Sequence, residues 1–145
     1  MKVGKKVVVV GGGNAAVDAA RTAVRLGSDV TIVYRRTRDQ MPAYAEEVEE
    51  ALHEGVKIET LVNPVEILVK DGAVCGLSCQ AQKLGQFDSS GRRRAEKAED
   101  FSTIEADQVI FAVGQKVDCE SLFKDANLDI IGNSRIKVNQ VNGQS

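Results

Sequence analysis

The sequence has few of the residues from which metal centres and disulfide frameworks are built. Its 145 residues include one histidine, His53, and three cysteines, Cys75, Cys79 and Cys119. A single histidine excludes a site that needs several histidines within one chain. Cys75 and Cys79 would lie about 13 Å apart on one face of an expected strand, too far for a disulfide or a shared metal ion. We therefore predict no metal site, and free thiols that suit a reducing cytoplasm.

Strong net charge and long apolar runs are also missing. The formal net charge is −2, which argues against a general nucleic-acid or membrane binder. The longest apolar run is too short to span a bilayer, and residues 1–6 lead into a valine run without a cleavage site of small residues. We therefore expect neither a membrane span nor a signal peptide. Because 43% of the residues are hydrophobic, the length predicts one ordinary folded domain.

The first sixty residues alternate short β-branched runs with amphipathic segments. The predicted strands and helices, in order, are Lys6–Val10, Asn14–Leu26, Val30–Tyr34, a helix from Pro42 or Ala43 to Glu54, and Lys57–Val62. A strand, a helix and a strand within about 30 residues require parallel pairing and a right-handed crossover. This pattern is typical of one mononucleotide-binding half of a doubly wound fold.

The pattern changes in the second half of the chain. Lys70-Asp71-Gly72 is a hairpin turn signal between two apolar runs, and the polar segment Lys83–Asp100 is expected to be a long exposed hairpin tip or loop. The predicted antiparallel strands and the fourth parallel strand that follows them are Val65–Val69, Ala73–Gln82, Phe101–Ile104 and Gln108–Val113. The predicted fold class is α/β: a Rossmann-like three-layer domain with a central parallel sheet and an antiparallel β-meander as a crossover.

A glycine-rich turn links the first expected strand to the first expected helix. Gly11-x-Gly13-x-x-Ala16 matches the dinucleotide fingerprint in the context that the fingerprint requires. Gly11 permits the tight turn, Gly13 lets a pyrophosphate approach the backbone, and the small Ala16 lets helix and strand pack closely. Helix N–H groups and the helix dipole would face the phosphates. The predicted contacts are Gly11, Gly12, Gly13, Asn14, Ala15 and Ala16.

The end of the second expected strand indicates which dinucleotide would bind. Domains that bind NAD or FAD normally have an acidic residue there for the ribose hydroxyls. The expected strand ends at Tyr34 and is followed by Arg35, Arg36 and Arg38, and the first carboxylate after the strand is Asp39. A guanidinium at this place suits a 2′-phosphate. We therefore predict NADP(H) as the cofactor, with Arg35 as the first contact, Arg36 or Arg38 assisting, and Tyr34 beside them.

The acidic residues of the two expected helices are interpreted as structural. Asp18 lies one turn into the first helix, and we expect it to have a structural role, by pairing with Arg21 or Arg25, or to contact a neighbouring domain. The second helix is expected to present a solvated acidic face made of Glu46, Glu47, Glu49 and Glu50. We predict no catalytic side chain, because hydride chemistry belongs to the cofactors.

Several of these stretches together resemble one family. Residues 11–21 (GGGNAAVDAAR), 33–36 (VYRR), 41–43 (MPA) and 54–56 (EGV) are similar to the pyridine-nucleotide domain of the glutamate synthase small (beta) subunit family, which dihydropyrimidine dehydrogenase-like flavoproteins share. Residues 106–115 (ADQVIFAVGQ) resemble a second hallmark of these proteins, a strand that ends in a small-x-Gly turn. The resemblance covers nearly the whole chain, and residues 80–100 are its least diagnostic part.

The resemblance implies a function that the chain shares with neighbouring domains. NADPH would give a hydride to FAD, and electrons would pass on to iron–sulfur clusters. By resemblance, Ala112, Val113 and Gly114 would contact the nicotinamide half. In such proteins this module is inserted into an FAD-binding domain, and residues 132–138 resemble the strand that leads back to that domain. We therefore expect residues 1–145 to be one NAD(P)H-binding domain excised from a larger FAD-containing oxidoreductase, with that FAD domain and a large catalytic subunit as partners.

Two other interpretations stay open at this point. The chain could be an FAD-binding domain, although the missing carboxylate argues against it. It could also be a non-enzymatic nucleotide-sensing or assembly module, because fold alone does not decide function. The final electron acceptor is not indicated by any residue of the sequence.

Overall fold

The computed structural model divides the chain into two units, residues 1–113 and residues 114–145. It describes residues 3–87, 91, 93–115, 118, 130–131 and 135–138. The elements in chain order are β1 (Lys6–Val10), α1 (Asn14–Arg25), β2 (Asp29–Tyr34), the short 3-10 helix η1 (Arg38–Gln40), α2 (Ala45–His53), β3 (Lys57–Thr60), β4 (Val62–Lys70), β5 (Ala73–Phe87), β6 (Arg93–Glu105), β7 (Gln108–Phe111), β8 (Ile130–Ile131) and β9 (Arg135–Ile136). In the second unit, β8 and β9 pair antiparallel. The strand expected at residues 132–138 lies partly outside the described residues, because residues 132–134 are not among them.

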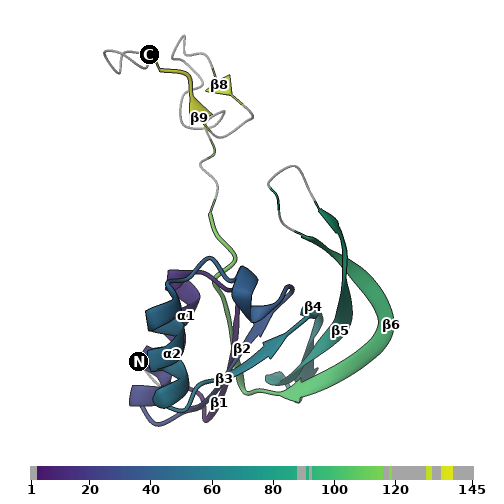
Figure 1. Ribbon diagram of the computed structural model, residues 1–145. Helices are drawn as coiled ribbons and strands as arrows, with labels where there is room; N and C mark the ends of the chain where they lie inside the picture. The colour runs from purple at the N-terminus through teal and green to yellow at the C-terminus, as the bar shows by residue number, and fades with distance from the viewer. Residues whose placement is uncertain are drawn as a thin grey trace. The chain divides into compact units, whose positions relative to one another are not determined.

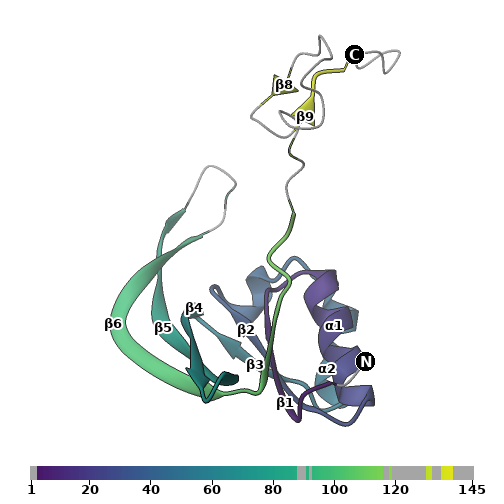
Figure 2. The ribbon, with the colours of Figure 1, turned by 180° about the vertical axis from the view of Figure 1, so that it is seen from behind.

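The first unit is built in three layers. Its central sheet is parallel in the order β3-β2-β1-β7, and a second sheet is antiparallel in the order β4-β5-β6. Figure 1 shows α1 and α2 on one face of the parallel sheet and the antiparallel strands on the other, and Figure 2 shows the same arrangement from behind. The predicted fold class is confirmed, including the meander between the third and fourth parallel strands.

The valine run of β1 lies at the centre of both interfaces. Val7 and Val9 pack with the helices, whereas Val8 and Val10 pack with Leu77 of the antiparallel sheet. All four valines are buried. A strand covered on both faces requires apolar side chains at every position, which is why this strand has a continuous run instead of alternation. Small residues of α1, including Ala16 and Ala20, allow the helix to pack closely on the sheet.

The antiparallel sheet extends further than the sequence predicted. β4 and β5 form a hairpin at Asp71 and Gly72, whose φ angles of 52° and 78° fit a type I′ turn, so that prediction is confirmed. The segment Lys83–Asp100 is the exposed end of a hairpin, which was one of the two expected forms, but most of it is paired strand instead of loop, because β5 runs to Phe87 and β6 begins at Arg93. Exposed paired strands do not need an apolar alternation.

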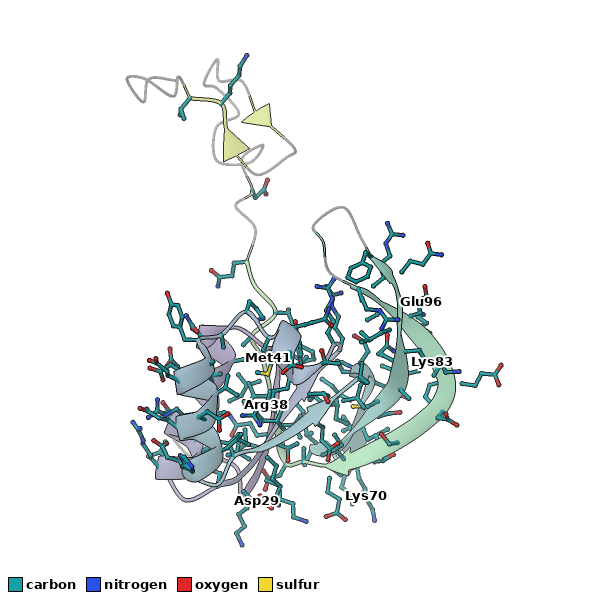
Figure 3. All side chains as sticks on the ribbon, viewed as in Figure 1. Asp29, Arg38, Met41, Lys70, Lys83 and Glu96 are labelled. Carbon is teal, nitrogen blue, oxygen red and sulfur yellow. The ribbon has the colours of Figure 1, made fainter. Side chains whose placement is uncertain are left out.

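Cross-strand contacts of polar groups hold this extended ribbon. Lys83 lies opposite Glu96 in the register of β5 and β6, and the Glu96 carboxylate lies over Gly85, 2.0 Å from where a Cβ of that residue would be; Figure 3 labels Lys83 and Glu96. The Arg93 guanidinium donates to the carbonyls of Gly85 and Leu84, at 2.9 and 2.8 Å. Because these contacts are made by polar side chains and backbone, the local sequence has the composition of a loop.

Other element boundaries differ from the prediction by about one to three residues, and two of these differences bear on the site. The second helix begins at Ala45, not at Pro42 or Ala43, because Met41 is anchored in the core, residues 42 and 43 form a bend, and Tyr44 before the helix is extended; Figure 3 labels Met41. The third parallel strand ends at Thr60, not at Val62. Leu61 alone separates β3 from β4, and it has a φ of 57°.

An ion-pair cluster joins the outer faces of α1 and α2. Arg21 pairs with Glu47, with Glu50 at 2.6 Å and with Glu54 at 2.8 Å, and Arg25 also pairs with Glu54, at 2.6 Å. The expected pairing of Asp18 with these arginines is therefore wrong, because the arginines reach across to α2. The acidic face of α2 is solvent-exposed at Glu46, Glu49 and Glu50, as expected. Some of its glutamates also form ion pairs that were not expected, including Glu49 with Arg38.

This cluster predicts a dependence of stability on pH. The hydrogen bond from Arg21, followed by that from Arg25, lowers the pKa of Glu54 from 4.5 to about 2. A depressed folded-state pKa adds stability above about pH 4.5 that is lost as the pH falls towards about 2. We expect Glu54→Gln to unfold at lower urea concentration than the wild type at pH 7 and to approach the wild type near pH 2.

The matched control is Glu99→Gln, a change at an exposed position of β6. It should follow the wild type at both pH values. A Glu54→Gln variant whose stability deficit is the same at pH 7 and near pH 2 would show that the ion pairs are not its cause.

Candidate functional site

The site lies where the chain reverses its direction of travel across the parallel sheet. From β1 the chain moves to β2 and β3 on one side, whereas β7 lies on the other side of β1. Val10 is opposite Phe111 in this register, so the turns after β1 and β7 begin side by side. The Ala112 N–H donates to the Val10 carbonyl at 2.8 Å. In open α/β sheets, ligands bind outside the carboxyl ends of the strands at such a switch point.

Two of the three glycines are required by packing within the protein. Gly11 has a φ of 146°, and a Cβ there would lie 2.4 Å from the Ala112 carbonyl oxygen. A Cβ on Gly12 would lie 2.5 Å from the ring of Tyr34. The tight turn predicted at Gly11 is therefore seen, together with a close approach to the turn after β7. Sequence reasoning did not find the packing of Tyr34 on Gly12.

The third glycine faces open space. A Cβ on Gly13 would meet no atom nearer than Pro42 Cγ, at 4.0 Å. Gly13 is also the N-cap residue of α1, and no side chain caps the helix there. The Gly13 carbonyl accepts hydrogen bonds from the N–H groups of Ala16 and Val17. The N–H groups of Asn14 and Ala15, earlier in the helix, have no carbonyl one turn back. This geometry fits an anionic group bound against the backbone.

The segment between β2 and α2 is fastened to the glycine turn. The Ala43 N–H donates to the Gly12 carbonyl at 3.0 Å, and the Tyr44 N–H donates to Asn14 Oδ1 at 2.9 Å. These contacts were not predicted from the sequence. The only signal for them in the sequence is Pro42, which restricts the chain locally and which by itself predicts a helix start. The Asn14 side chain, expected to touch a cofactor, thus also ties the amino ends of the two helices together.

The predicted arginines differ in their surroundings. Arg35 is exposed and forms no ion pair with any residue that the structure describes. Arg36 is half-buried, and its carbonyl accepts a hydrogen bond from Leu61 at 3.1 Å. Arg38 begins η1 and pairs with Glu49 of α2 (Figure 3 labels Arg38). Tyr34 donates from its hydroxyl to the Gln40 carbonyl at 2.8 Å, which holds the end of β2 against η1.

The three residues after β7 that are expected to contact the nicotinamide half of the cofactor belong to two different units of the chain, because the first unit ends at Val113. Ala112 is bonded to β1 as described, and Val113 is 70% exposed at the end of the first unit. Gly114 has a φ of 96° and belongs to the second unit.

Other kinds of site find little support in the described part of the chain. No group of three or more His, Cys, Asp or Glu residues there is arranged to hold a metal ion. No helix in that part is both long and apolar enough to cross a membrane. Cys75 is exposed and Cys79 is buried, and burial raises the pKa of the Cys79 thiol; Cys119 lies outside the described residues.

Comparison with known proteins identifies the family. The family model for pyridine nucleotide-disulphide oxidoreductases matches residues 1–142. The NADP(+)-dependent formate dehydrogenase subunit beta of Moorella thermoacetica is 42% identical over 142 residues, which is 95% of this chain and 20% of that protein. The glutamate synthase [NADPH] small chain of Escherichia coli (strain K12) is 44% identical over 114 residues, 77% of this chain and 24% of that protein. The chain thus spans about a fifth to a quarter of the length of these relatives.

A solved structure agrees with the layer arrangement. The crystal structure of T. acidophilum thioredoxin reductase superposes with a TM-score of 0.74 over 97% of this chain and 42% of that chain, at 22% sequence identity. That likeness establishes the fold. The relatives confirm that the sequence resembles the glutamate synthase small subunit family. The chain belongs to the pyridine nucleotide-disulphide oxidoreductase family.

Proposed function

We propose that the chain binds NADPH at the β1–β7 switch point and presents its nicotinamide ring to an FAD held elsewhere in a longer protein. One observation carries the proposal: the open backbone at Gly13 and the exposed Arg35 follow adjacent strands at the same edge of the sheet. A dinucleotide laid across this edge would place its pyrophosphate at the start of α1 and its adenosine ribose beyond β2.

The residues fit the two parts of the molecule that carry charge. Gly13 leaves room for the pyrophosphate, and the first N–H groups of α1 would donate to it. The exposed guanidinium of Arg35 would bind the 2′-phosphate through charge-assisted hydrogen bonds. Arg38 is expected to assist only if its pair with Glu49 opens. Bound NADPH would supply the hydride, and the protein's task is to hold and orient the nucleotide.

The partners in this proposal are suggested by the names of the relatives and by the family resemblance of the sequence. The relatives are named as an NADP(+)-dependent formate dehydrogenase subunit and an NADPH glutamate synthase small chain. Because the chain covers only about a fifth to a quarter of each, we propose that it is one nucleotide-binding domain of a longer chain. An FAD-binding domain, iron–sulfur clusters and a large catalytic subunit would complete the electron path.

Titration of the 145-residue chain with NADPH, NADH and FAD tests the proposal. We expect binding of NADPH to be tighter than binding of NADH, and FAD to bind weakly. Preferential binding of FAD would support the alternative of an FAD-binding domain. A chain that binds none of the three would overturn the proposal.

Replacement of Arg35 tests the recognition of the 2′-phosphate. Loss of a charge-assisted hydrogen bond worth about 1.5–3 kcal/mol should weaken NADPH binding about tenfold to a hundredfold in Arg35→Ala. NADH, which lacks this phosphate, should bind almost as it does to the wild type. Isothermal titration calorimetry with both nucleotides measures the two affinities.

Arg94→Ala is the matched control, because Arg94 is an exposed arginine on β6. It should leave both affinities unchanged. Equal losses of NADPH and NADH affinity in Arg35→Ala would contradict the assignment of Arg35.

A further inference from the structure

Leu61 is one of two non-glycine residues with a positive φ in the described part of the chain; the other is Asp71. At φ 57°, a leucine adopts a left-handed conformation that L-residues with large side chains avoid. Such a conformation persists only where the surrounding structure holds it, and it is found disproportionately at functional sites. Leu61 is also the single residue that separates the parallel strand β3 from the antiparallel strand β4.

Hydrogen bonds hold both sides of this residue. The Leu61 N–H donates to the carbonyl of Arg36 at 3.1 Å. Its own carbonyl accepts from the Gln82 N–H at 2.7 Å. Leu61 therefore links the backbone of the arginine segment to the antiparallel sheet.

The partner residue on the antiparallel sheet, Gln82, lies beside an irregularity in the pairing of β5 with β6. The register of β5 against β6 shifts between Gln80 and Gln82. Gln82 is buried, with 9% of its surface exposed, and its side-chain amide donates to the carbonyls of Gln80 and Ala81, at 3.2 and 3.0 Å. The extra residues of this bulge lie on β6, because one residue of β5 there faces three of β6. On the other side of β5, the bond from the Gln82 N–H to the Leu61 carbonyl continues the β4–β5 ladder beyond the Val62–Ala81 pair.

We propose that Leu61 is a positioning residue that sets the arginine segment for the 2′-phosphate. Its N–H holds the carbonyl of Arg36, the residue that follows Arg35, so the height of Arg35 above the sheet edge depends on the left-handed turn at Leu61. This inference rests on the proposed binding of NADPH. It assigns part of the selectivity between NADPH and NADH to a residue that would touch neither nucleotide.

Paired substitutions at the two positive-φ positions separate positioning from stability. Valine is β-branched and disfavours the left-handed region strongly, whereas glycine adopts it without steric cost. We expect Leu61→Val to weaken NADPH binding about three- to tenfold, the effect of losing one ordinary hydrogen bond, and to leave NADH binding nearly unchanged. Leu61→Gly should keep the wild-type preference. Asp71→Val introduces the same conflict in the exposed hairpin turn and should leave both affinities as in the wild type.

A second measurement requires no variant that could fail to fold. Hydrogen exchange of the Leu61 amide in the wild-type chain is followed with adenosine 2′,5′-bisphosphate and with adenosine 5′-monophosphate. The proposal predicts that only the probe with the 2′-phosphate slows this exchange. Equal exchange rates with both probes, or equal losses of NADPH and NADH affinity in Leu61→Val, would overturn it.

The two proposals fail in different ways. A wild-type chain that binds NADPH no better than NADH refutes the NADPH proposal, and the role of Leu61 falls with it. A wild-type chain that prefers NADPH while Leu61→Val keeps the same preference refutes only the role of Leu61.

Discussion

Gly11→Ala is expected to lower the free energy of unfolding by about 2–6 kcal/mol. Two separate conflicts contribute. The φ of 146° lies in a region that only glycine enters readily, and the added Cβ would be 2.4 Å from the backbone oxygen of Ala112, which cannot rotate away as a side chain could. Because ordinary domains are stable by about 5–15 kcal/mol, a large part of the stability would be lost. Urea unfolding followed by circular dichroism measures the change.

Gly27→Ala is the matched control for the backbone conflict alone. Gly27 has a φ of 92° at the end of α1, and a Cβ there would meet nothing within 4 Å. We expect it to cost about 1–2 kcal/mol, the penalty of a left-handed conformation without a clash. If Gly11→Ala were no more destabilising than Gly27→Ala, the contact between the turns after β1 and β7 would not be as close as described.

Gly13→Ala is expected to give the opposite result: a stable fold with little nucleotide binding. Its φ of −91° suits alanine, and a Cβ would meet no protein atom nearer than 4.0 Å, so stability should change by less than about 1 kcal/mol. The same methyl group would project to where the pyrophosphate must approach the start of α1. Loss of two charge-assisted hydrogen bonds from the first N–H groups of α1 to the pyrophosphate would weaken nucleotide binding by at least about a hundredfold.

The nucleotide pair separates this effect from that of Arg35. Both NADPH and NADH contain the pyrophosphate, so Gly13→Ala should weaken both equally, whereas Arg35→Ala should weaken NADPH alone. The measurement is calorimetric titration at matched protein concentration, with unfolding curves as the check on folding. A Gly13→Ala chain that binds NADPH as the wild type does would place the pyrophosphate elsewhere.

The sequence was most informative where the local structure depends on residues that are neighbours in the chain. The strand, turn and helix around Gly11–Ala16 could be predicted, because β-branched runs, glycine turns and apolar periodicity are local signals. The hairpin at Asp71-Gly72 followed from turn chemistry in the same way. The Lys83–Asp100 strands were missed because exposed antiparallel pairing leaves no apolar alternation in the sequence.

Local pattern alone determined the α/β class, the glycine turn and the arginines in place of an acidic residue. Only the tertiary structure decided how these features meet. It set Ala112 against Gly11, Tyr34 against Gly12, and Arg21 across to Glu54 instead of Asp18. It also placed Leu61 between Arg36 and Gln82. The physical reason is that each of these contacts joins residues far apart in the chain, and the strand order and layer packing that bring them together are not encoded in any single short stretch.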